Sequence, residues 1–230
     1  MINGSSSIFR SWPGAKTIYL DPGHGGIDSG AAHRDAQGHV DLEEKNLSLA
    51  VAKRLAELLN VAGYNVLLSR DGDYTLTKFN AWETRERIKE EAQARVDLAN
   101  DSRAALYIAL HFNGYSDPRL AGTQTYYCRE RPFAEQNRRL ALLVQASMLR
   151  NLRSVGYLPR DRGAKEDRSI GKPYGHLFTI GANADFARLH RTLDLHPQQA
   201  PPQTASPGSR RQRRRSPLYP SDRPSAPASW

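Results

Sequence analysis

The sequence contains a single cysteine, Cys128, among its 230 residues. One thiol excludes an intramolecular disulfide, and it also excludes the structural zinc sites that need several cysteines. No apolar run approaches the roughly 18 residues of a membrane-spanning helix. Residues 1–10 lack the apolar stretch of a signal peptide. We therefore expect a soluble chain without a membrane span, whose export is either not signal-driven or directed by a leader outside this sequence.

Apolar residues make up 39% of the chain, which is below the usual range for a globular protein. The shortage is concentrated in residues 197–230, which hold eight of the fourteen prolines, six Arg, one Asp and no Lys or Glu. That segment carries 6 − 1 = +5 of the total net charge of 33 − 24 = +9. Its composition buries too little apolar surface to offset the entropy of ordering, so it predicts a disordered tail.

The remaining pattern predicts one α/β domain. Short β-prone runs bounded by turn residues predict strands over residues 17–20, 65–69, 104–110 and 123–128, and a weaker run gives a last strand at 175–180. Apolar residues at helical spacing predict helices between Glu44 and Gly63 and over 81–100 and 134–152. The order of elements favours a mixed, mostly parallel sheet with helices on both faces. We expect an N-terminal extension (1–16), the domain (17–196) and the tail (197–230).

Two imidazoles and a carboxylate stand at the ends of these predicted elements. His24 follows the first strand, His111 follows the third, and Glu44 begins the first helix. The carboxyl ends of parallel strands meet at one edge of a sheet, where sites usually form. A hydrolytic zinc commonly takes three ligands from His and Asp or Glu and leaves a fourth position for water. The pattern therefore predicts a zinc site.

Seven short segments between residue 17 and about residue 165 give this site a family context. Together they resemble the zinc-dependent N-acetylmuramoyl-L-alanine amidases of the amidase-3 type, in which they occur in the same order. They are Asp-Pro-Gly-His-Gly-Gly at 21–26, Glu-Lys-Asn at 44–46, Ser69-Arg70, Arg-Val-Asp-Leu-Ala-Asn at 95–100, His111 with Asn113, Gly-Thr-Gln-Thr-Tyr-Tyr at 122–127, and Asp-Arg-Gly-Ala-Lys at 161–165.

The resemblance implies that His24, Glu44 and His111 hold Zn²⁺ and that Asn113 lies near the substrate. Glu44 is preferred to Glu43 because it directly precedes Lys-Asn. The implied reaction is hydrolysis of the amide bond between N-acetylmuramic acid and L-alanine in peptidoglycan. A zinc ion supports such chemistry by lowering the pKa of its water to about 7 and by polarising the carbonyl. The implied place of action is the cell wall, periplasmic or extracellular. Whether the protein is a bacterial autolysin or a phage endolysin stays open.

The sequence departs from the family pattern near its C-terminus. These amidases carry a further Glu, the general base, on a strand that reads Pro-x-Val-Leu-Val-Glu, whereas this chain has no Glu after Glu166. The catalytic base is therefore left unassigned. Two explanations stay open: a diverged amidase, or a change of reading frame after about residue 180.

Two alternative functions follow from these features. The missing Glu is compatible with a relative that binds zinc and peptidoglycan without cutting. The arginines within 210–215 are compatible with a protein that binds an anionic polymer through its tail. That cluster has no interleaved aromatic residues, which favours a solvated tail over a nucleic-acid site. The sequence does not indicate an oligomeric state.

The remaining polar residues receive structural interpretations. Cys128 is expected to be a small buried apolar residue. Arg70 is expected to be an ion-pair partner of a nearby carboxylate rather than a substrate ligand. Residues 161–163 by themselves fit a simple turn, and the family resemblance implies a loop that lines the substrate groove. Five histidines match no motif and are expected on the solvated surface, with His176 also weighed as an adventitious ligand: His33, His39, His176, His190 and His196.

Overall fold

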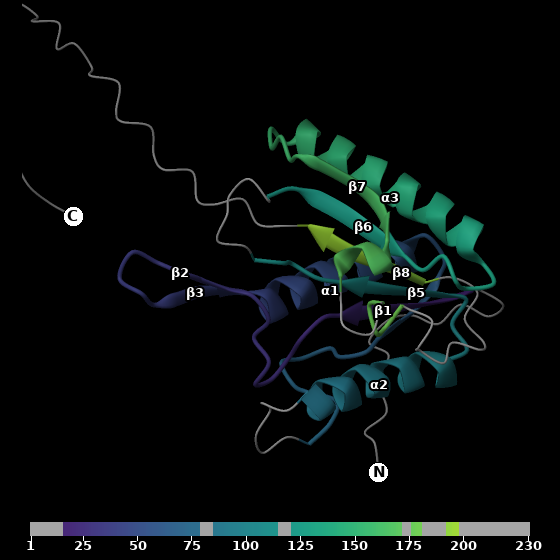
Figure 1. Ribbon diagram of the computed structural model, residues 1–230, viewed down its shortest axis with the longest axis horizontal. Coiled ribbons are helices and arrows are strands. Elements are labelled where there is room, and N and C mark those ends of the chain that lie inside the picture. The colour runs from purple at the N-terminus through teal and green to yellow at the C-terminus, as the bar shows by residue number, and fades with distance from the viewer. Residues whose placement is uncertain (1–15, 79–84, 115–120, 172–175, 181–191, 198–230) are drawn as a thin grey trace, which may run out of the picture.

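A computed structural model describes residues 16–78, 85–114, 121–171, 176–180 and 192–197. Six of its strands form one sheet in the order β4-β1-β5-β8-β6-β7 (Figure 1). Neighbouring strands run parallel, except that β6 and β8 are antiparallel. The mixed, mostly parallel sheet is therefore confirmed. Its strands are β1 (Thr17–Pro22), β4 (Asn65–Leu68), β5 (Leu106–Leu110), β6 (Thr123–Tyr127), β7 (Asp161–Glu166) and β8 (Thr192–Pro197).

Helices cover both faces of this sheet, as predicted. The helices α1 (Glu44–Val61) and α3 (Ala134–Ser154) pack against one face, and α2 (Arg85–Asp101) packs against the other. Side chains alternate along a strand, so β1 sends Ile18 and Leu20 to the α1 side and Tyr19 to the α2 side. A strand buried on both faces reads as a continuous apolar run, which is why β1 and β5 could be recognised in the sequence.

The helix α1 approaches the sheet through small residues rather than through its larger apolar ones. Ala52 and Ala56 are fully buried, whereas Val51 and Leu58 are 41% and 54% exposed. The apolar residues at helical spacing that predicted this helix are therefore not all buried. The larger residues instead line a cavity of about 1560 Å³ between α1 and α3. None of His24, Glu44 and His111 lines this cavity.

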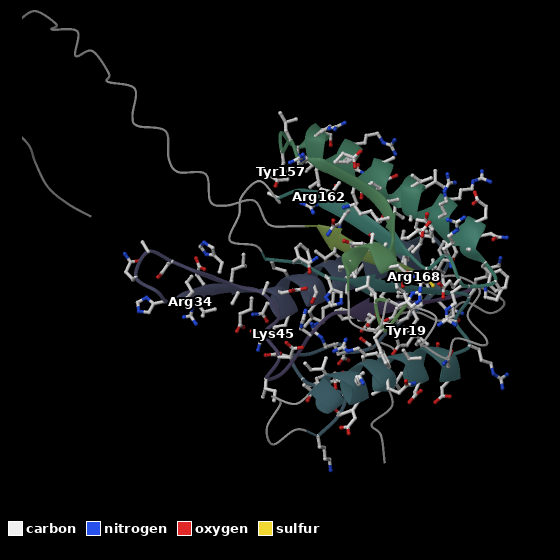
Figure 2. The ribbon with its side chains drawn as sticks, in the orientation of Figure 1. Tyr19, Arg34, Lys45, Tyr157, Arg162 and Arg168 are labelled. Atoms are coloured by element: carbon white, nitrogen blue, oxygen red, sulfur yellow. The ribbon has the colours of Figure 1, made fainter. Side chains whose placement is uncertain are left out.

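A two-stranded hairpin, β2 (Ala32–Arg34) and β3 (Val40–Glu43), precedes α1 and was not predicted. Its turn is closed by Asp35, whose carboxylate accepts hydrogen bonds from the backbone N–H groups of Gln37 and His39. The hairpin projects from the body of the domain (Figure 1). Arg34 lies on the hairpin and Lys45 lies at its base (Figure 2).

The C-terminal third differs most from the sequence prediction. Residues 161–163, predicted as a loop, begin β7, which is the outermost strand on one side of the sheet. The strand predicted at 175–180 is wrong for residues 176–180, which form turns, while residue 175 lies outside the described residues. The last strand is β8, which ends at Pro197, so the tail boundary predicted at residue 197 is wrong by one residue because Pro197 belongs to the sheet. The predicted tail from residue 198 onward also lies outside the described residues.

The strand register fixes which chain segments share an edge of the sheet. Pro22 pairs with Leu110 and Leu110 pairs with Leu195, so the carboxyl ends of β1, β5 and β8 lie together. The antiparallel pairing of Thr123 with Pro197 brings the start of β6 to this same edge. The carboxyl ends of β6 and β7 therefore lie at the opposite edge.

Candidate metal centre

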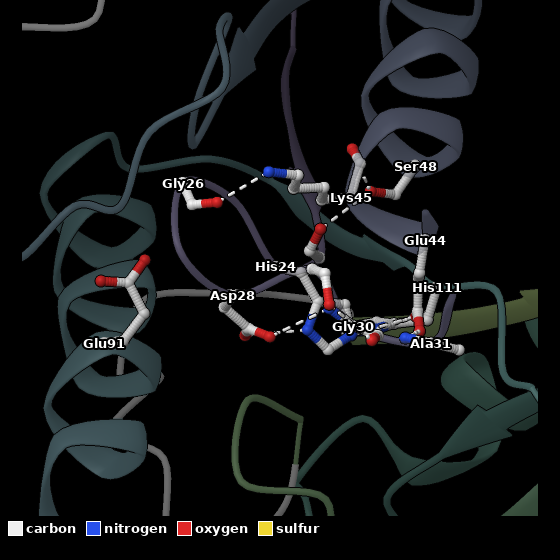
Figure 3. A network of polar contacts seen from close by, with 12 residues as sticks. His24, Gly26, Asp28, Gly30, Ala31, Glu44, Lys45, Ser48, Glu91 and His111 are labelled. Carbon is white, nitrogen blue, oxygen red and sulfur yellow. Dashed lines mark hydrogen bonds and ion pairs between the residues drawn. The ribbon is translucent and has the colours of Figure 1, made fainter. Parts of the chain in front are cut away.

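Three side chains from three separate elements converge at the edge formed by the ends of β1 and β5 (Figure 3). His24 Nε2 lies 3.1 Å from Glu44 Oε1, and His111 Nδ1 lies 3.0 Å from the same oxygen. The two ring nitrogens are 3.3 Å apart. A tetrahedral zinc with ligand distances of about 2.0–2.1 Å separates its ligands by about 3.3 Å. The spacing and chemistry of these donors therefore fit a zinc ion.

Neighbouring polar groups orient each of these donors. His24 Nδ1 is hydrogen bonded to Asp28 Oδ2 at 2.8 Å, which leaves Nε2 toward Glu44. A carboxylate on the second ring nitrogen is the usual partner of a metal-binding histidine. Glu44 Oε2 accepts the Ala31 N–H at 2.9 Å, and Oε1 accepts the Phe112 N–H at 2.8 Å. The carboxylate is thus fixed by both of its oxygens.

The electrostatics of the centre favour an anionic Glu44. Burial raises the pKa of Glu44, but hydrogen bonds and charges from His111 and His24 outweigh burial and hold it well below its usual range. For His24, burial lowers the pKa, but Asp28 and Glu44 outweigh burial and raise it to about 9. In the absence of a metal, a proton on His24 balances the surrounding carboxylates.

Two buried arginines hold the turn that carries His24. Arg70 donates from Nε to the Pro22 carbonyl and from Nη2 to the Gly23 and Lys45 carbonyls, at 2.7–3.0 Å. Arg95 donates to the carbonyls of Pro22 and His24 at 2.9 and 2.8 Å. These bonds give a structural reason for an arginine shortly after β4, Arg70, and for another within α2, Arg95. Among the described residues no carboxylate forms the predicted ion pair with Arg70; its guanidinium binds backbone carbonyls, and the charges of Asp21 and Asp73 act on it without such a contact.

The backbone of the turn is tightly constrained. His24 has a φ of +62°, a conformation that side chains rarely adopt and that often occurs at functional sites. A Cβ atom on Gly23 would lie 2.2 Å from His111 Cε1. Glycine is therefore required at position 23 for His111 to reach the centre.

The other predicted site residues lie around this edge. Glu43 is directed to Lys45 and Asn46 rather than to the centre, in agreement with the choice of Glu44. Asn113 follows His111 by two residues and is half-buried. Asp161 begins β7 beside Thr123, and its carboxylate accepts a hydrogen bond from Gln145 at 2.7 Å.

A second group of metal-ligand residue types is buried elsewhere in the domain. Cys128, Asp167 and His176 offer ligand atoms that all lie within 4.8 Å of one another. Cys128 is buried, as expected, but the surface position predicted for His176 is wrong because that residue is only 5% exposed. His176 was weighed as an adventitious ligand, but the group itself could not be predicted, since its members are scattered along the chain and belong to no motif.

Within the described part of the chain, none of the helices has the length and apolar character of a membrane span.

Residues 18–185 match the Amidase_3 family, described as N-acetylmuramoyl-L-alanine amidase. Among curated proteins, the germination-specific N-acetylmuramoyl-L-alanine amidase of Bacillus subtilis is 36% identical over 167 residues, which cover 72% of this chain and 66% of that protein. AmiA of Escherichia coli is 31% identical over 113 residues, which cover 49% of this chain and 32% of AmiA.

Solved structures show the same fold. The CwlD amidase from Clostridioides difficile, determined in complex with the GerS lipoprotein, aligns with a TM-score of 0.61 and 24% identity, covering 79% of this chain and 81% of that one. Cwp6 from Clostridium difficile aligns with a TM-score of 0.56 and 25% identity, covering 79% of this chain and 24% of Cwp6.

Proposed function

The chain belongs to the Amidase_3 family of N-acetylmuramoyl-L-alanine amidases, and from this premise we propose that it hydrolyses the amide bond between N-acetylmuramic acid and L-alanine in peptidoglycan, with zinc as cofactor. The observation that carries the proposal is the convergence of His24, Glu44 and His111, with donor atoms 3.0–3.3 Å apart. Peptidoglycan is then the partner, and the proposed place of action is the cell wall, outside the cytoplasm.

The three donors would hold the metal through His24 Nε2, His111 Nδ1 and the Glu44 carboxylate. When bound, zinc supplies a water of lowered pKa and polarises the scissile carbonyl. Asp28 keeps the proton of His24 on Nδ1, so that Nε2 presents a lone pair. The N–H groups of Ala31 and Phe112 hold the Glu44 carboxylate in place, so that little reorganisation accompanies binding.

Substrate contact is assigned to Asn113, which follows His111 at the same edge. The general base remains unassigned, since β8, which lies beside β5, reads Thr-Leu-Asp-Leu-His-Pro and contains no Glu. A relative that binds zinc and peptidoglycan without cutting is therefore the competing outcome of the test.

The test incubates the zinc-loaded full chain with purified peptidoglycan, with and without a chelator, and identifies products by mass spectrometry. We expect chelator-sensitive release of stem peptides that begin with L-alanine. Bound zinc without any released peptide contradicts the proposed hydrolysis and favours the non-cutting relative. Release that persists in excess chelator contradicts the role of the metal.

A matched pair of variants assigns the carboxylate. Glu44→Gln removes the negative charge of the buried side chain that faces both histidines, whereas Glu43→Gln makes the same chemical change one residue earlier. We expect Glu44→Gln to lose tight zinc binding and peptide release, with Glu43→Gln retaining both. The reverse pattern means that Glu43 is the ligand.

A further inference from the structure

The buried group of Cys128, Asp167 and His176 joins three segments at the edge of the sheet opposite the His24 centre. Cys128 directly follows β6, and Asp167 begins the short helix η2 (Asp167–Ile170) directly after β7. His176 begins the described segment 176–180. The strand β5 alone spans five residues, or about 16 Å at 3.3 Å per residue. This group is therefore separate from the centre already described.

The donor atoms of this group have the spacing of metal ligands. His176 Nδ1 lies 3.0 Å from Asp167 Oδ2 and 3.9 Å from Cys128 Sγ. A tetrahedral zinc with a Zn–S distance of about 2.3 Å and Zn–N and Zn–O distances of about 2.1 Å separates sulfur from nitrogen by about 3.6 Å, and nitrogen from oxygen by about 3.4 Å. The two distances from His176 Nδ1 are within a few tenths of an ångström of these values, and Cys128 Sγ lies within 4.8 Å of the Asp167 carboxylate.

One carboxylate oxygen of this group has no hydrogen-bond partner among the described residues. Asp167 is fully buried, and backbone N–H groups of Arg168 and Leu177 act on its carboxylate, but within the described part of the chain its Oδ1 makes no hydrogen bond. A buried carboxylate oxygen without a partner is costly, and such atoms usually mark an ion or a water. A divalent cation among these side chains would provide the missing partner.

The second nitrogen of His176 has the partner that a metal-binding histidine needs. His176 Nε2 lies 3.2 Å from Glu130 Oε2, and the other oxygen of Glu130 lies 2.6 Å from Arg168 Nη1. A carboxylate that accepts the second ring N–H fixes the tautomer of a ligating histidine. Nδ1 is then left as the ligand atom, on the side of Cys128 and Asp167. The half-exposed Glu130 side chain places this nitrogen near solvent, from which an ion can enter.

A catalytic triad of Cys128, His176 and Asp167 does not fit this geometry. In a triad the nucleophile and the carboxylate contact opposite nitrogens of the imidazole, whereas Cys128 and Asp167 both face Nδ1. Glu130 faces the opposite nitrogen, but the buried Asp167 carboxylate beside Cys128 and Nδ1 has no place in a triad and fits a third ligand of a metal ion.

We propose that Cys128, Asp167 and His176 bind a second zinc ion, with Glu130 orienting His176. A sulfur, a nitrogen and an oxygen donor suit zinc, which takes all three in proteins. Three protein donors leave a fourth position for water, and the ion would link the ends of β6 and β7 to the segment 176–180, whose Ile180 is fully buried in the core on the α2 side. The inference does not depend on amidase activity.

The test measures metal content and cobalt spectra of the full chain. The protein is stripped with a chelator and titrated with Zn²⁺, and the expected endpoint is two ions per chain, falling to one in Cys128→Ser. Titration with Co²⁺ is expected to produce a near-ultraviolet thiolate-to-cobalt absorption band, because a thiolate ligand gives such a band and the His24 centre contains no sulfur. The band should vanish in Cys128→Ser and in His176→Ala.

His111→Ala is the matched control, because it removes a ligand of the other centre and should leave the band unchanged. Zinc should also raise the melting temperature of His111→Ala, but not that of a variant carrying both His111→Ala and Cys128→Ser. Two results overturn the proposal: saturation of the unaltered chain at one ion without a thiolate band, or two zinc ions retained by folded Cys128→Ser. Neither result bears on whether peptidoglycan is cut.

Discussion

Gly30 packs against two of the three residues of the metal centre. A Cβ atom there would lie 2.6 Å from His24 Cδ2 and 2.8 Å from Glu44 Cβ, and the residue has a φ of +64°. We expect Gly30→Ala to displace both ligands and to weaken zinc binding at least tenfold. Titration with zinc against a competing chelator measures the change.

Gly38 offers the matched control for this prediction. It also has a positive φ, +87°, but a Cβ atom there would meet nothing within 4 Å. Gly38→Ala should therefore carry only the backbone penalty of about 1–2 kcal/mol and keep its zinc affinity. Equal affinities in the two variants would show that the packing around His24 and Glu44 does not determine metal binding.

Arg70 gives a second prediction at this scale, because one planar guanidinium donates to four backbone carbonyls. A lysine carries its donors on a single atom and cannot reach all four. Each buried group left without a partner costs about 1–3 kcal/mol, so Arg70→Lys should lower the free energy of unfolding by about 3 kcal/mol. Urea unfolding of zinc-free protein measures this change. Arg54→Lys, at an exposed position of α1 beside Glu57, should change it by less than about 0.5 kcal/mol.

Asp21 joins four elements of the fold. Its carboxylate lies at the end of β1 and accepts hydrogen bonds from Ser69 after β4, Arg95 of α2 and Tyr107 of β5. Burial raises the pKa of Asp21, but Arg95 and these hydrogen bonds outweigh burial and hold it below its usual value. The carboxylate therefore stabilises the fold at pH values above about 4, and that stability is lost as the pH falls through the folded-state pKa.

From this network we expect Asp21→Asn to lower the free energy of unfolding by about 3–5 kcal/mol at pH 7, because it leaves the buried Arg95 without its partner. The difference from the unaltered chain should shrink below about pH 4, where Asp21 becomes protonated in the unfolded chain, and it should shrink further as the pH falls to the lower folded-state pKa. Urea unfolding of zinc-free protein at pH 7, 5 and 3 measures this. Asp73→Asn is the control: Asp73 pairs with Lys45 on the surface, and its loss should cost less than about 1 kcal/mol. A difference that stays constant with pH contradicts the argument.

The elements that the sequence predicted are those whose pattern is local. Strands β1 and β5 are apolar runs, and the helices α1 and α3 have helical periodicity. The outermost strand β7 reads Asp-Arg-Gly-Ala-Lys-Glu. Charged residues on such a strand disfavour pairing with another chain, but they also remove the apolar pattern by which a strand is recognised in a sequence. The strand β8 contains two leucines and forms through pairing with β5 and β6, which are distant in the sequence. Conversely, the apolar residues near Ile180 fill the core from a turn.

At the scale of the whole molecule, residues that can bind a metal gather at both ends of the strands of the sheet. Only one of the two groups could be predicted from the sequence. His24, Glu44 and His111 could be predicted to meet because each stands at the end of a recognisable element within a family motif. Cys128, Asp167 and His176 could not, because their meeting depends on the antiparallel β6–β8 pairing that turns the end of β6 to the far edge. The supporting arginines were visible as motif residues, but their carbonyl partners were not.

The uneven charge of the chain gives the last prediction. Residues 198–230 contain six Arg and one Asp, so their removal lowers the net charge from +9 to +4. The metal ligands and all six strands of the sheet lie before residue 198, so a chain ending at Pro197 should keep its zinc content and peptide release. Binding to anionic polymers depends on charge, so elution of this shortened chain from heparin-agarose should require less salt. The full-length variant with glutamine at the five arginines within 210–215 preserves the length and should elute early as well. If either variant loses peptide release while retaining zinc, the basic segment contributes to hydrolysis of the wall polymer rather than only to polyanion binding.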